Sequence, residues 1–257
     1  MQLPIGYKEL NFKPLNRNMI EAVWTSITNN SGEYLVLPDG RADLILRFEL
    51  DKNNKAQNIT PIIAAPYSTA MRVPYKNQLG FVGLRFRPAM AGLVLNISLA
   101  KIAQNTFYGN DAIKLVPAVN KLTTGNATID ELINRLDTFA DQRHNISLPK
   151  NIQKSFDLMH LSGGRISIFE IVKSLNISER SLLRNFKSLV GLSPKIFNAI
   201  LRFHRAIRLL KFTNMSIANV AFEAGFSDQS HMNREFRKLG GFTPANLPDL
   251  ALAGFSL

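Results

Sequence analysis

The sequence predicts an α+β protein with two domains: an N-terminal β-barrel or β-sandwich with accompanying helices, and an all-α C-terminal domain. Short β-rich runs separated by turn signals fill residues 1–115. Helical spacing begins near Thr128, and an internal repeat occupies residues 165–247. We expect a β-rich domain over residues 1–120, a helical linker over 121–164 and a second domain over 165–257.

The N-terminal part contains runs that are typical of half-buried strands. Residues 34–37, 43–49 and 81–86 are rich in β-forming side chains, and turn residues such as Asn, Asp, Gly and Pro separate them. In the last run apolar side chains alternate with residues of the opposite face, which is the period of a strand with one buried side. Several short strands of this kind predict a small sandwich or barrel.

The composition limits the function classes. The chain has 257 residues, 46% of them apolar, with a formal net charge of +12 and no cysteine. A pI near 10.1 favours a polyanionic partner, either nucleic acid or an anionic membrane surface. The absence of cysteine excludes disulfides, thiolate nucleophiles and cysteine-ligated metals.

The N-terminus and the apolar stretches argue against a membrane partner. The chain does not start with a charged segment followed by an apolar run, so we expect no secretory signal. The longest apolar stretch, near residues 88–100, is about a dozen residues, whereas a membrane span needs roughly 18. We therefore expect a cytoplasmic protein.

Two capping boxes predict helix starts in the second half of the chain. In Thr128–Glu131 and in Ser167–Glu170, the first and last side chains can satisfy free N–H groups of a first helical turn. A further helical stretch covers about 152–161, and 162–164 (Ser-Gly-Gly) has the composition of a hinge. Everything after this hinge is predicted to be helical.

The internal repeat predicts two helix-turn-helix units. Each copy has a capping serine, a residue suited to a left-handed turn, a second capping serine and a terminal glycine. In order, these residues are Ser167, Asn176, Ser178 and Gly191 in the first copy, and Ser216, Gly225, Ser227 and Gly241 in the second. The second copy has one extra residue at its turn, and two helices joined by a short turn form this motif.

The second helix of each copy has an apolar face and a basic or amide-bearing face. Leu182, Phe186 and Leu189, matched by Met232, Phe236 and Leu239, should be buried. The candidate DNA contacts are Arg180, Arg184 and Lys187 in the first copy, and Gln229, Ser230, His231, Asn233, Arg234, Arg237 and Lys238 in the second. Arginine can donate two hydrogen bonds to guanine, and Asn or Gln can pair with adenine.

These faces have an alternative explanation, because a basic helix face is often only solvated. The duplication of the whole unit favours nucleic-acid binding instead. Residues 161–247 carry 13 Lys and Arg against 5 Asp and Glu, a net charge of +8. A positively charged surface of this kind suits phosphate.

Residues 194–211 are predicted to form one helix between the two units. Eighteen residues at about 1.5 Å each span roughly 27 Å. A rigid spacer of that length can place two recognition helices about one turn of B-DNA apart, near 34 Å. Arg202, Arg205 and Arg208 lie on the polar side, where phosphate contacts and local ion pairs are equally open. His204 lies on the apolar side and is interpreted as a core residue.

The repeat closely resembles the DNA-binding domain of the AraC/XylS family of transcription regulators. The resemblance covers about 90 residues and is sharpest in 221–231, 234–238 and 241–244. It implies two helix-turn-helix subdomains docked on one face of DNA. The base-reading candidates that it implies are Arg180, Ser181, Arg184, Gln229, Ser230, His231 and Asn233, whereas Arg234 and Arg237 suit phosphates equally well. Leu183 departs from the family, which often has a small polar residue there.

The first half resembles the cupin-like N-terminal domain of some of these regulators. The residues concerned are Trp24, the segments 37–40 and 43–45, and the segment 83–88. Such a domain senses an effector or mediates dimerisation. The effector-binding candidates are Trp24, Arg85 and Arg87. The alternatives are a core tryptophan, a solvated strand face, or an ion pair of the arginines with Asp39 or Asp43.

The histidines and the repeat also bear on cofactors, function and partners. The four histidines (His144, His160, His204 and His231) all lie beyond the β-rich region, so we expect no metal and no cofactor. We expect a sequence-specific regulator that binds promoter or operator DNA and is associated with the nucleoid. A small-molecule effector, RNA polymerase and a second copy of the chain are partners left open. The alternatives are a nonspecific architectural DNA-binding protein and a regulator without an effector. A DNA-repair enzyme with a nucleophilic cysteine is excluded.

Overall fold

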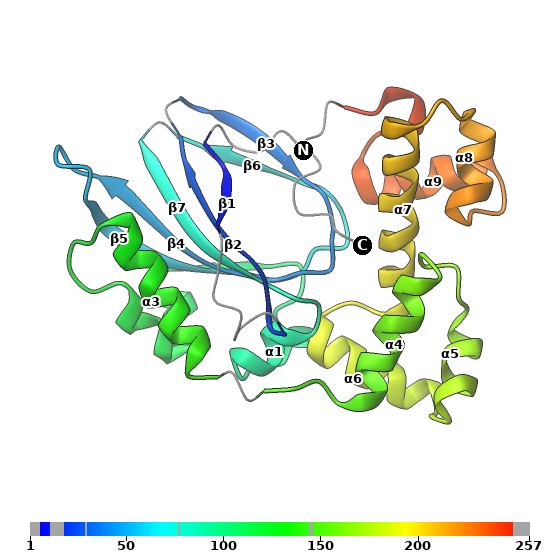
Figure 1. Ribbon diagram of the computed structural model, residues 1–257, viewed down its shortest axis with the longest axis horizontal. Helices are drawn as coiled ribbons and strands as arrows, with labels where there is room; N and C mark the ends of the chain where they lie inside the picture. The colour runs from blue at the N-terminus through cyan, green and yellow to red at the C-terminus, as the bar shows by residue number, and fades with distance from the viewer. Residues whose placement is uncertain (1–5, 11–17, 29, 77, 144–145, 249–257) are drawn as a thin grey trace.

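The computed structural model describes residues 6–10, 18–28, 30–76, 78–143 and 146–248. They form a sheet-rich N-terminal domain and a helical C-terminal domain, which lie side by side (Figure 1). The α+β fold class predicted from the sequence is therefore confirmed. No helix in these ranges is long and apolar enough to cross a membrane.

The N-terminal domain contains two antiparallel sheets. The strands are β1 (Lys8–Leu10), β2 (Ile20–Ile27), β3 (Gly32–Val36), β4 (Asp43–Leu50), β5 (Ala56–Ala64), β6 (Met71–Tyr75), β7 (Leu79–Phe86) and β8 (Thr106–Tyr108). One sheet has the order β1-β2-β7-β4-β5-β8, and the other pairs β3 with β6. The larger sheet has β1 and β8 at its edges, so the described strands form a sandwich-like arrangement and not a closed barrel.

The two faces of the larger sheet have different neighbours. On β4, Leu44, Leu46 and Phe48 are buried in a core shared with the helices of this domain. These helices are α1 (Met90–Val94), α2 (Asn110–Leu115) and α3 (Ile129–Asp141), together with the 3₁₀ turns η2 (Leu99–Lys101) and η3 (Pro117–Leu122). The alternate residues of β4, Asp43 and Arg47 among them, line a cavity on the opposite face.

The C-terminal domain is entirely helical in the described residues. Its helices are α4 (Lys150–Leu161), α5 (Ile168–Leu175), α6 (Glu179–Val190), α7 (Pro194–Phe212), α8 (Ile217–Ala224) and α9 (Gln229–Gly240), followed by the 3₁₀ turn η4 (Pro244–Asn246). Helix α4 contributes Ile152, Phe156 and Met159 to the core of this domain. Helix α3 belongs to the N-terminal core instead, so the segment expected to be a linker is divided between the two cores.

Helix α7 joins the two helix-turn-helix units through matched aromatic contacts. Phe186 of α6 and Phe236 of α9 occupy equivalent positions in the repeat, and both are fully buried. The ring of Phe186 lies 5.6 Å from Phe197, and the ring of Phe236 lies 4.8 Å from Phe203. Because Phe197 and Phe203 both belong to α7, this helix sets the relative position of the two units.

The helix starts follow the sequence prediction with one correction. The capping boxes at Thr128 and Ser167 are both present, and the Ser178 hydroxyl accepts a hydrogen bond from the Ser181 N–H at 3.2 Å. The prediction that Ser227 caps α9 is wrong. Asp228 caps it and accepts from the His231 N–H at 2.7 Å. A carboxylate at a helix N-terminus also interacts favourably with the helix dipole.

Candidate DNA-binding interface

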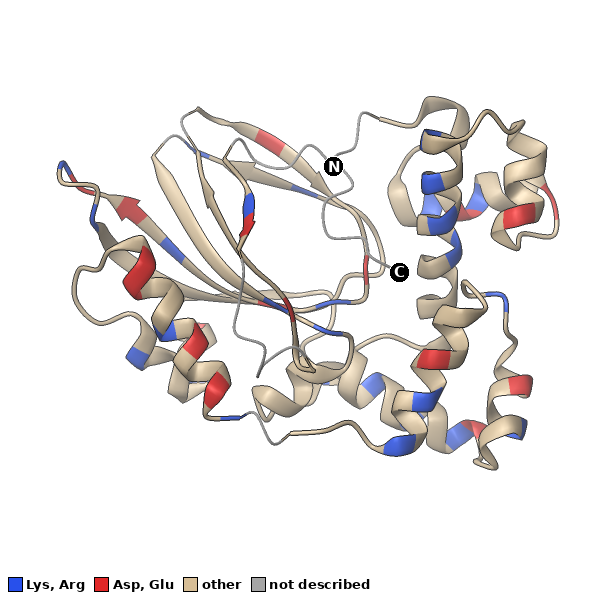
Figure 2. Ribbon diagram, viewed as in Figure 1, with Lys and Arg blue, Asp and Glu red and all other residues tan. Residues whose placement is uncertain are grey.

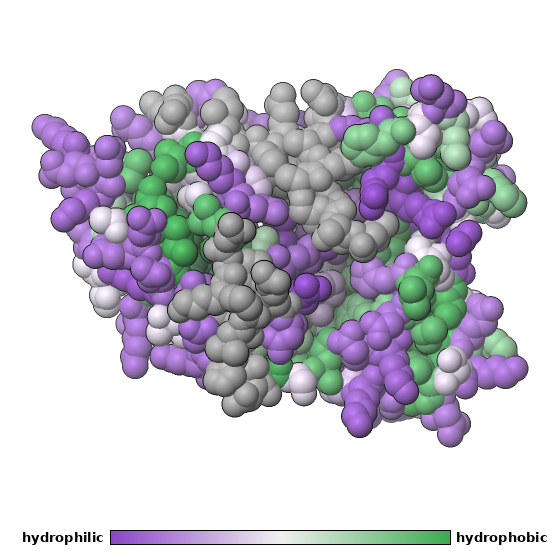
Figure 3. All heavy atoms as spheres, viewed as in Figure 1, coloured by the Kyte–Doolittle hydropathy of each residue, from purple (hydrophilic) through white to green (hydrophobic). Residues whose placement is uncertain are grey.

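The second helices of the two units, α6 and α9, present the predicted contact residues to solvent. Arg180, Arg184, Lys187, Gln229, Ser230, Arg234, Arg237 and Lys238 are all exposed. Figure 2 shows Lys and Arg distributed over α6, α7 and α9. In the space-filling view, hydrophilic side chains cover much of the unit that contains α4, α5 and α6 (Figure 3). Arg184 and Arg234 are equivalent in the repeat, so each unit offers one exposed guanidinium at the same place.

Three predicted contacts are only partly exposed, namely Ser181, His231 and Asn233. The His231 side chain takes part in the start of α9. Its Nδ1 lies 3.1 Å from the Ser227 hydroxyl, and its ring meets the Phe226 ring edge-on at 5.4 Å. The ring is therefore oriented by its own helix-turn-helix unit, which leaves Nε2 as its outer polar atom.

The arginines of α7 have different environments. The Arg202 Nη1 donates to the Gly164 carbonyl at 2.6 Å, and its guanidinium lies 5.7 Å from the Phe226 ring. This arginine therefore connects α7 to the segment before α5 through a backbone carbonyl. Arg205 is partly buried, and Arg208 is exposed.

Helices α6 and α9 both contact the N-terminal domain at their C-terminal ends. The Ser188 hydroxyl near the end of α6 lies 3.5 Å from that of Ser98, and the Leu239 carbonyl of α9 accepts from the Ala70 N–H at 2.6 Å. Ser98 and Ala70 belong to the N-terminal domain. The N-terminal ends of α6 and α9 thus lie on the side of the molecule away from the sheets (Figure 1).

The comparison with protein families divides the chain in the same way. Residues 171–248 match a family described as a helix-turn-helix domain, and residues 13–107 match a domain of unknown function, DUF6597. Residues 171–248 form an AraC-type helix-turn-helix domain. The matched segment contains both α6 and α9, so the resemblance noted in the sequence is confirmed for this region.

Similar proteins match the chain over a limited length. The transcriptional regulator MtrA of Neisseria gonorrhoeae is 32% identical over 108 residues, which are 42% of this chain and 34% of that protein. The transcriptional activator RhaS of Escherichia coli is 30% identical over 77 residues, 30% of this chain and 28% of that protein. The chain therefore spans about a third of the length of these curated relatives.

A solved structure shows the same kind of partial match. It is a transcriptional regulator from Chromobacterium violaceum described by its AraC-type DNA-binding domain. It is 29% identical, with a TM-score of 0.35, and the match covers 37% of this chain and 87% of that chain.

The AraC-type domain packs against residues 37–40 of the N-terminal domain. His204 of α7 is 5% exposed, and its Nε2 lies 2.6 Å from the Pro38 carbonyl oxygen, to which it donates. Leu37 is buried in the C-terminal core, and Gly40 lies against the Phe197 ring. Burial lowers the pKa of His204 to about 4. No sequence pattern indicates this contact, because its partners are 166 positions apart.

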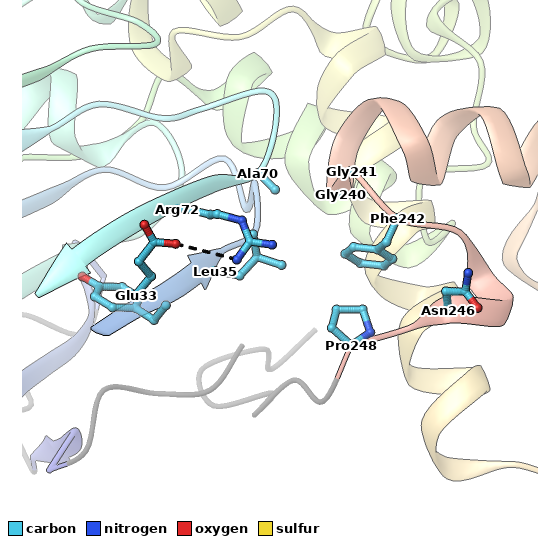
Figure 4. Close-up of a pocket in the computed structure, with 10 residues that line it drawn as sticks. Glu33, Leu35, Ala70, Arg72, Gly240, Gly241, Phe242, Asn246 and Pro248 are labelled. Atoms are coloured by element: carbon cyan, nitrogen blue, oxygen red, sulfur yellow. Dashed lines mark ion pairs between the residues drawn. The ribbon is translucent and has the colours of Figure 1, made fainter. Parts of the chain in front are cut away.

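A second contact region lies between β3–β6 and the end of α9. Figure 4 shows this cleft, which has a volume of about 420 Å³ and brings Arg72 and Leu35 opposite Phe242 and Pro248. Arg72 pairs with Glu33 at 3.9 Å, and both side chains are exposed. The AraC-type domain therefore meets the N-terminal domain both at α7 and beside α9.

The structure places two of the three effector-binding candidates in a cavity and the third outside it. Trp24 and Arg85 line the cavity beside the larger sheet, whereas Arg87 is exposed and does not line it. Arg87 lies beyond the end of β7, which closes at Phe86. Arg85 pairs with Asp43 at 3.5 Å, and burial raises the pKa of that carboxyl.

Arg47 also lines the cavity and was missed at the sequence level. The period of strand β4 could have found it, since residues 43, 45 and 47 share one face.

Proposed function

We propose that the chain is a sequence-specific DNA-binding transcription regulator whose N-terminal domain modulates the DNA-binding domain. The observation that carries the proposal is the pair of repeated recognition helices. Both expose basic side chains, and both are held at their C-terminal ends with their N-terminal ends free. Helix α7, with 19 residues, spans roughly 28 Å between the units, which suits two successive major grooves at about 34 Å.

The proposed contacts divide by chemistry. Arg184 and Arg234 suit base edges or phosphates, and the amides of Gln229 and Asn233 suit adenine. The remaining proposed contacts are Arg180, Ser181, Lys187, Ser230, His231, Arg237 and Lys238. Such a protein acts where the chromosome lies, which predicts cytoplasmic localisation. RNA polymerase and a second copy of the chain are further partners that the sequence leaves open.

Competition binding tests sequence specificity. Sites mapped genome-wide would supply the probe, and the full chain should bind it roughly 10³-fold or more tightly than scrambled DNA. Equal affinity for scrambled DNA would identify a nonspecific architectural protein. A nonspecific architectural protein also binds DNA. The ratio of the affinities for the mapped site and for scrambled DNA therefore distinguishes the two functions, whereas the affinity for the mapped site alone does not.

Alanine substitutions test the recognition helices. Arg184→Ala or Arg234→Ala should weaken binding to the mapped site by about 1–3 kcal/mol if the arginine pairs with guanine. If the arginine contacts a phosphate, binding to all sequences should weaken alike, with a smaller salt dependence. Lys154→Ala, which removes an exposed charge from α4, is the matched control. The assignment fails if the control loses as much affinity as either variant.

Modulation by the N-terminal domain is supported by the segment 37–41. Pro38, Asp39 and Arg41 line the cavity beside the larger sheet, and the Pro38 carbonyl oxygen holds His204 of α7. A change in this wall is therefore transmitted directly to the helix that joins the two units. A regulator without an effector would keep the same DNA affinity in every ligand condition.

A further inference from the structure

We propose that the cavity beside the larger sheet binds a small carboxylate with an apolar body, and that Arg85 is its anchor. The binding stands independently of DNA recognition, whereas its regulatory consequence rests on the proposed function. The inference is carried by the size and walls of the cavity and by the guanidinium donors of Arg85 and Arg47 that no described residue uses.

The cavity is small and largely apolar. Its volume is about 250 Å³, which equals roughly eight water molecules at about 30 Å³ each. Six aromatic side chains contribute to the wall: Tyr7, Trp24, Tyr34, Tyr67, Phe81 and Tyr108. Apolar walls with a few polar groups are typical of small-molecule sites. The volume suits a ligand of about eight to twelve non-hydrogen atoms.

Arg85 has donors that the protein does not use. Its side chain is 12% exposed, and its buried Nε has no hydrogen-bond partner among the described residues. Its ion pair with Asp43 has an Nε–Oδ1 distance of 3.5 Å, which is longer than a charge-assisted hydrogen bond. A guanidinium has five N–H donors in a fixed plane. Leaving the buried N–H donors of a guanidinium unpaired costs free energy, so the site favours a ligand with an anionic hydrogen-bond acceptor.

The other charged groups of the cavity indicate the sign of the ligand. Three arginines and two aspartates line it: Arg41, Arg47, Arg85, Asp39 and Asp43. Arg41 contacts Glu21 and lies 3.9 Å from Asp39. Arg47 has no ion pair or hydrogen bond from its side chain to any described residue. With Glu21 counted, three arginines face three carboxylates, so the formal charges balance. The guanidinium donors of Arg47 nevertheless have no partner among the described residues, and an anionic ligand can accept from them.

The aspartates give a cationic ligand little to bind. Asp43 is paired with Arg85 and also accepts a hydrogen bond from Trp24 Nε1 at 3.0 Å. Asp39 accepts from the Arg41 backbone N–H at 2.9 Å. Both carboxylates thus have protein donors, whereas Arg85 and Arg47 have donors to spare. A planar carboxylate matches the guanidinium fork better than a neutral hydroxyl group does.

Paired probes test the charge of the ligand. Benzoate, hexanoate and 3-phenylpropionate, each compared with its primary amide, would be titrated into the full chain by calorimetry without DNA. We expect at least one carboxylate to bind 10-fold or more tightly than its amide. The proposal is overturned if no carboxylate binds, or if each amide binds as well as its acid, which would indicate a neutral ligand.

Variants test the anchor. Arg85→Gln and Arg47→Gln should each weaken carboxylate binding at least 10-fold, whereas Arg87→Gln, outside the cavity, should not. The double change Asp43→Asn with Arg85→Gln replaces the buried ion pair by amides and covers the case in which Arg85→Gln alone does not fold. Unchanged affinity in the folded Arg85 variants would overturn the assignment. A chain that binds carboxylate but not DNA would disprove only the proposed function.

Discussion

Acidification from pH 7 to pH 4 should destabilise the docking of α7 on the N-terminal domain, because His204 is held there in its neutral form. The ring is 5% exposed, and its Nε2 donates to the Pro38 carbonyl oxygen. Desolvation is the main cause that lowers its pKa, and Arg41 adds to it, while the Pro38 hydrogen bond and Asp39 oppose it. Protonation keeps the Nε2–H donor, so the cost comes from burying a charge and not from losing the hydrogen bond.

The magnitude follows from the two pKa values. The pKa falls from 6.5 to about 4 on folding, and each pH unit corresponds to about 1.4 kcal/mol. The unfolded chain binds the proton more readily, so the stabilisation is complete above pH 6.5 and is lost as the pH falls towards 4. The loss amounts to roughly 3 kcal/mol at pH 4, a large part of a typical stability of about 5–15 kcal/mol.

Urea denaturation between pH 7 and pH 4 would measure this loss. The reference is His204→Gln, which keeps an N–H donor near Pro38 but does not titrate, so the other ionisable groups cancel in the difference. We expect the wild-type advantage over this variant to shrink by about 3 kcal/mol across the range. Parallel stability curves would refute the reasoning, as would a His204 proton resonance that titrates near 6.5.

Three further substitutions test local features by the free energy of unfolding. Asp228→Ala should cost about 1 kcal/mol through the lost cap of α9, and an unchanged midpoint would contradict it. Phe236→Ala should cost about 3–5 kcal/mol because the ring is fully buried; a loss below about 1 kcal/mol would contradict the packing. Gly164→Ala should destabilise the protein more than Gly241→Ala. Both glycines have a positive φ, but only at Gly164 would a Cβ meet backbone, at 2.3 Å from the Asn198 carbonyl oxygen.

The features predicted well from the sequence are those set by neighbouring residues. A capping box depends on side chains three positions apart, and both predicted boxes are present. The turn of the first unit contains Asn176 with a φ of 50°, as its place between two helices requires. The failure at Ser227 has the same local origin. The extra residue in the second copy moves the cap by one position, and a carboxylate takes the place of the hydroxyl.

The features that the sequence could not provide depend on distant partners. Helix α4 has the same pattern of apolar residues whether it links two domains or completes a core. The contacts of Phe156 with Phe186 and Phe197 show that it completes the core of the C-terminal domain. The rings are 5.0 Å and 5.1 Å apart. A DNA-binding fragment that began after α4 would therefore expose this aromatic cluster. Likewise, the sequence alone does not show that Arg85 and Arg47 line the same cavity. That becomes visible only when β7 pairs with β4.

Coupling between the cavity and DNA, where it exists, has a direct route through α7, besides the contacts that α6 and α9 make with the N-terminal domain. Pro38 belongs to the cavity wall and to the contact with His204, and the same helix carries Phe197 and Phe203 against the two recognition helices. One displacement at this wall therefore reaches both units at once. A ligand that binds equally well with α7 docked or released changes nothing, however tight its binding. Linkage then requires that mapped-site DNA change the affinity for the carboxylate by the same factor by which the carboxylate changes the affinity for DNA.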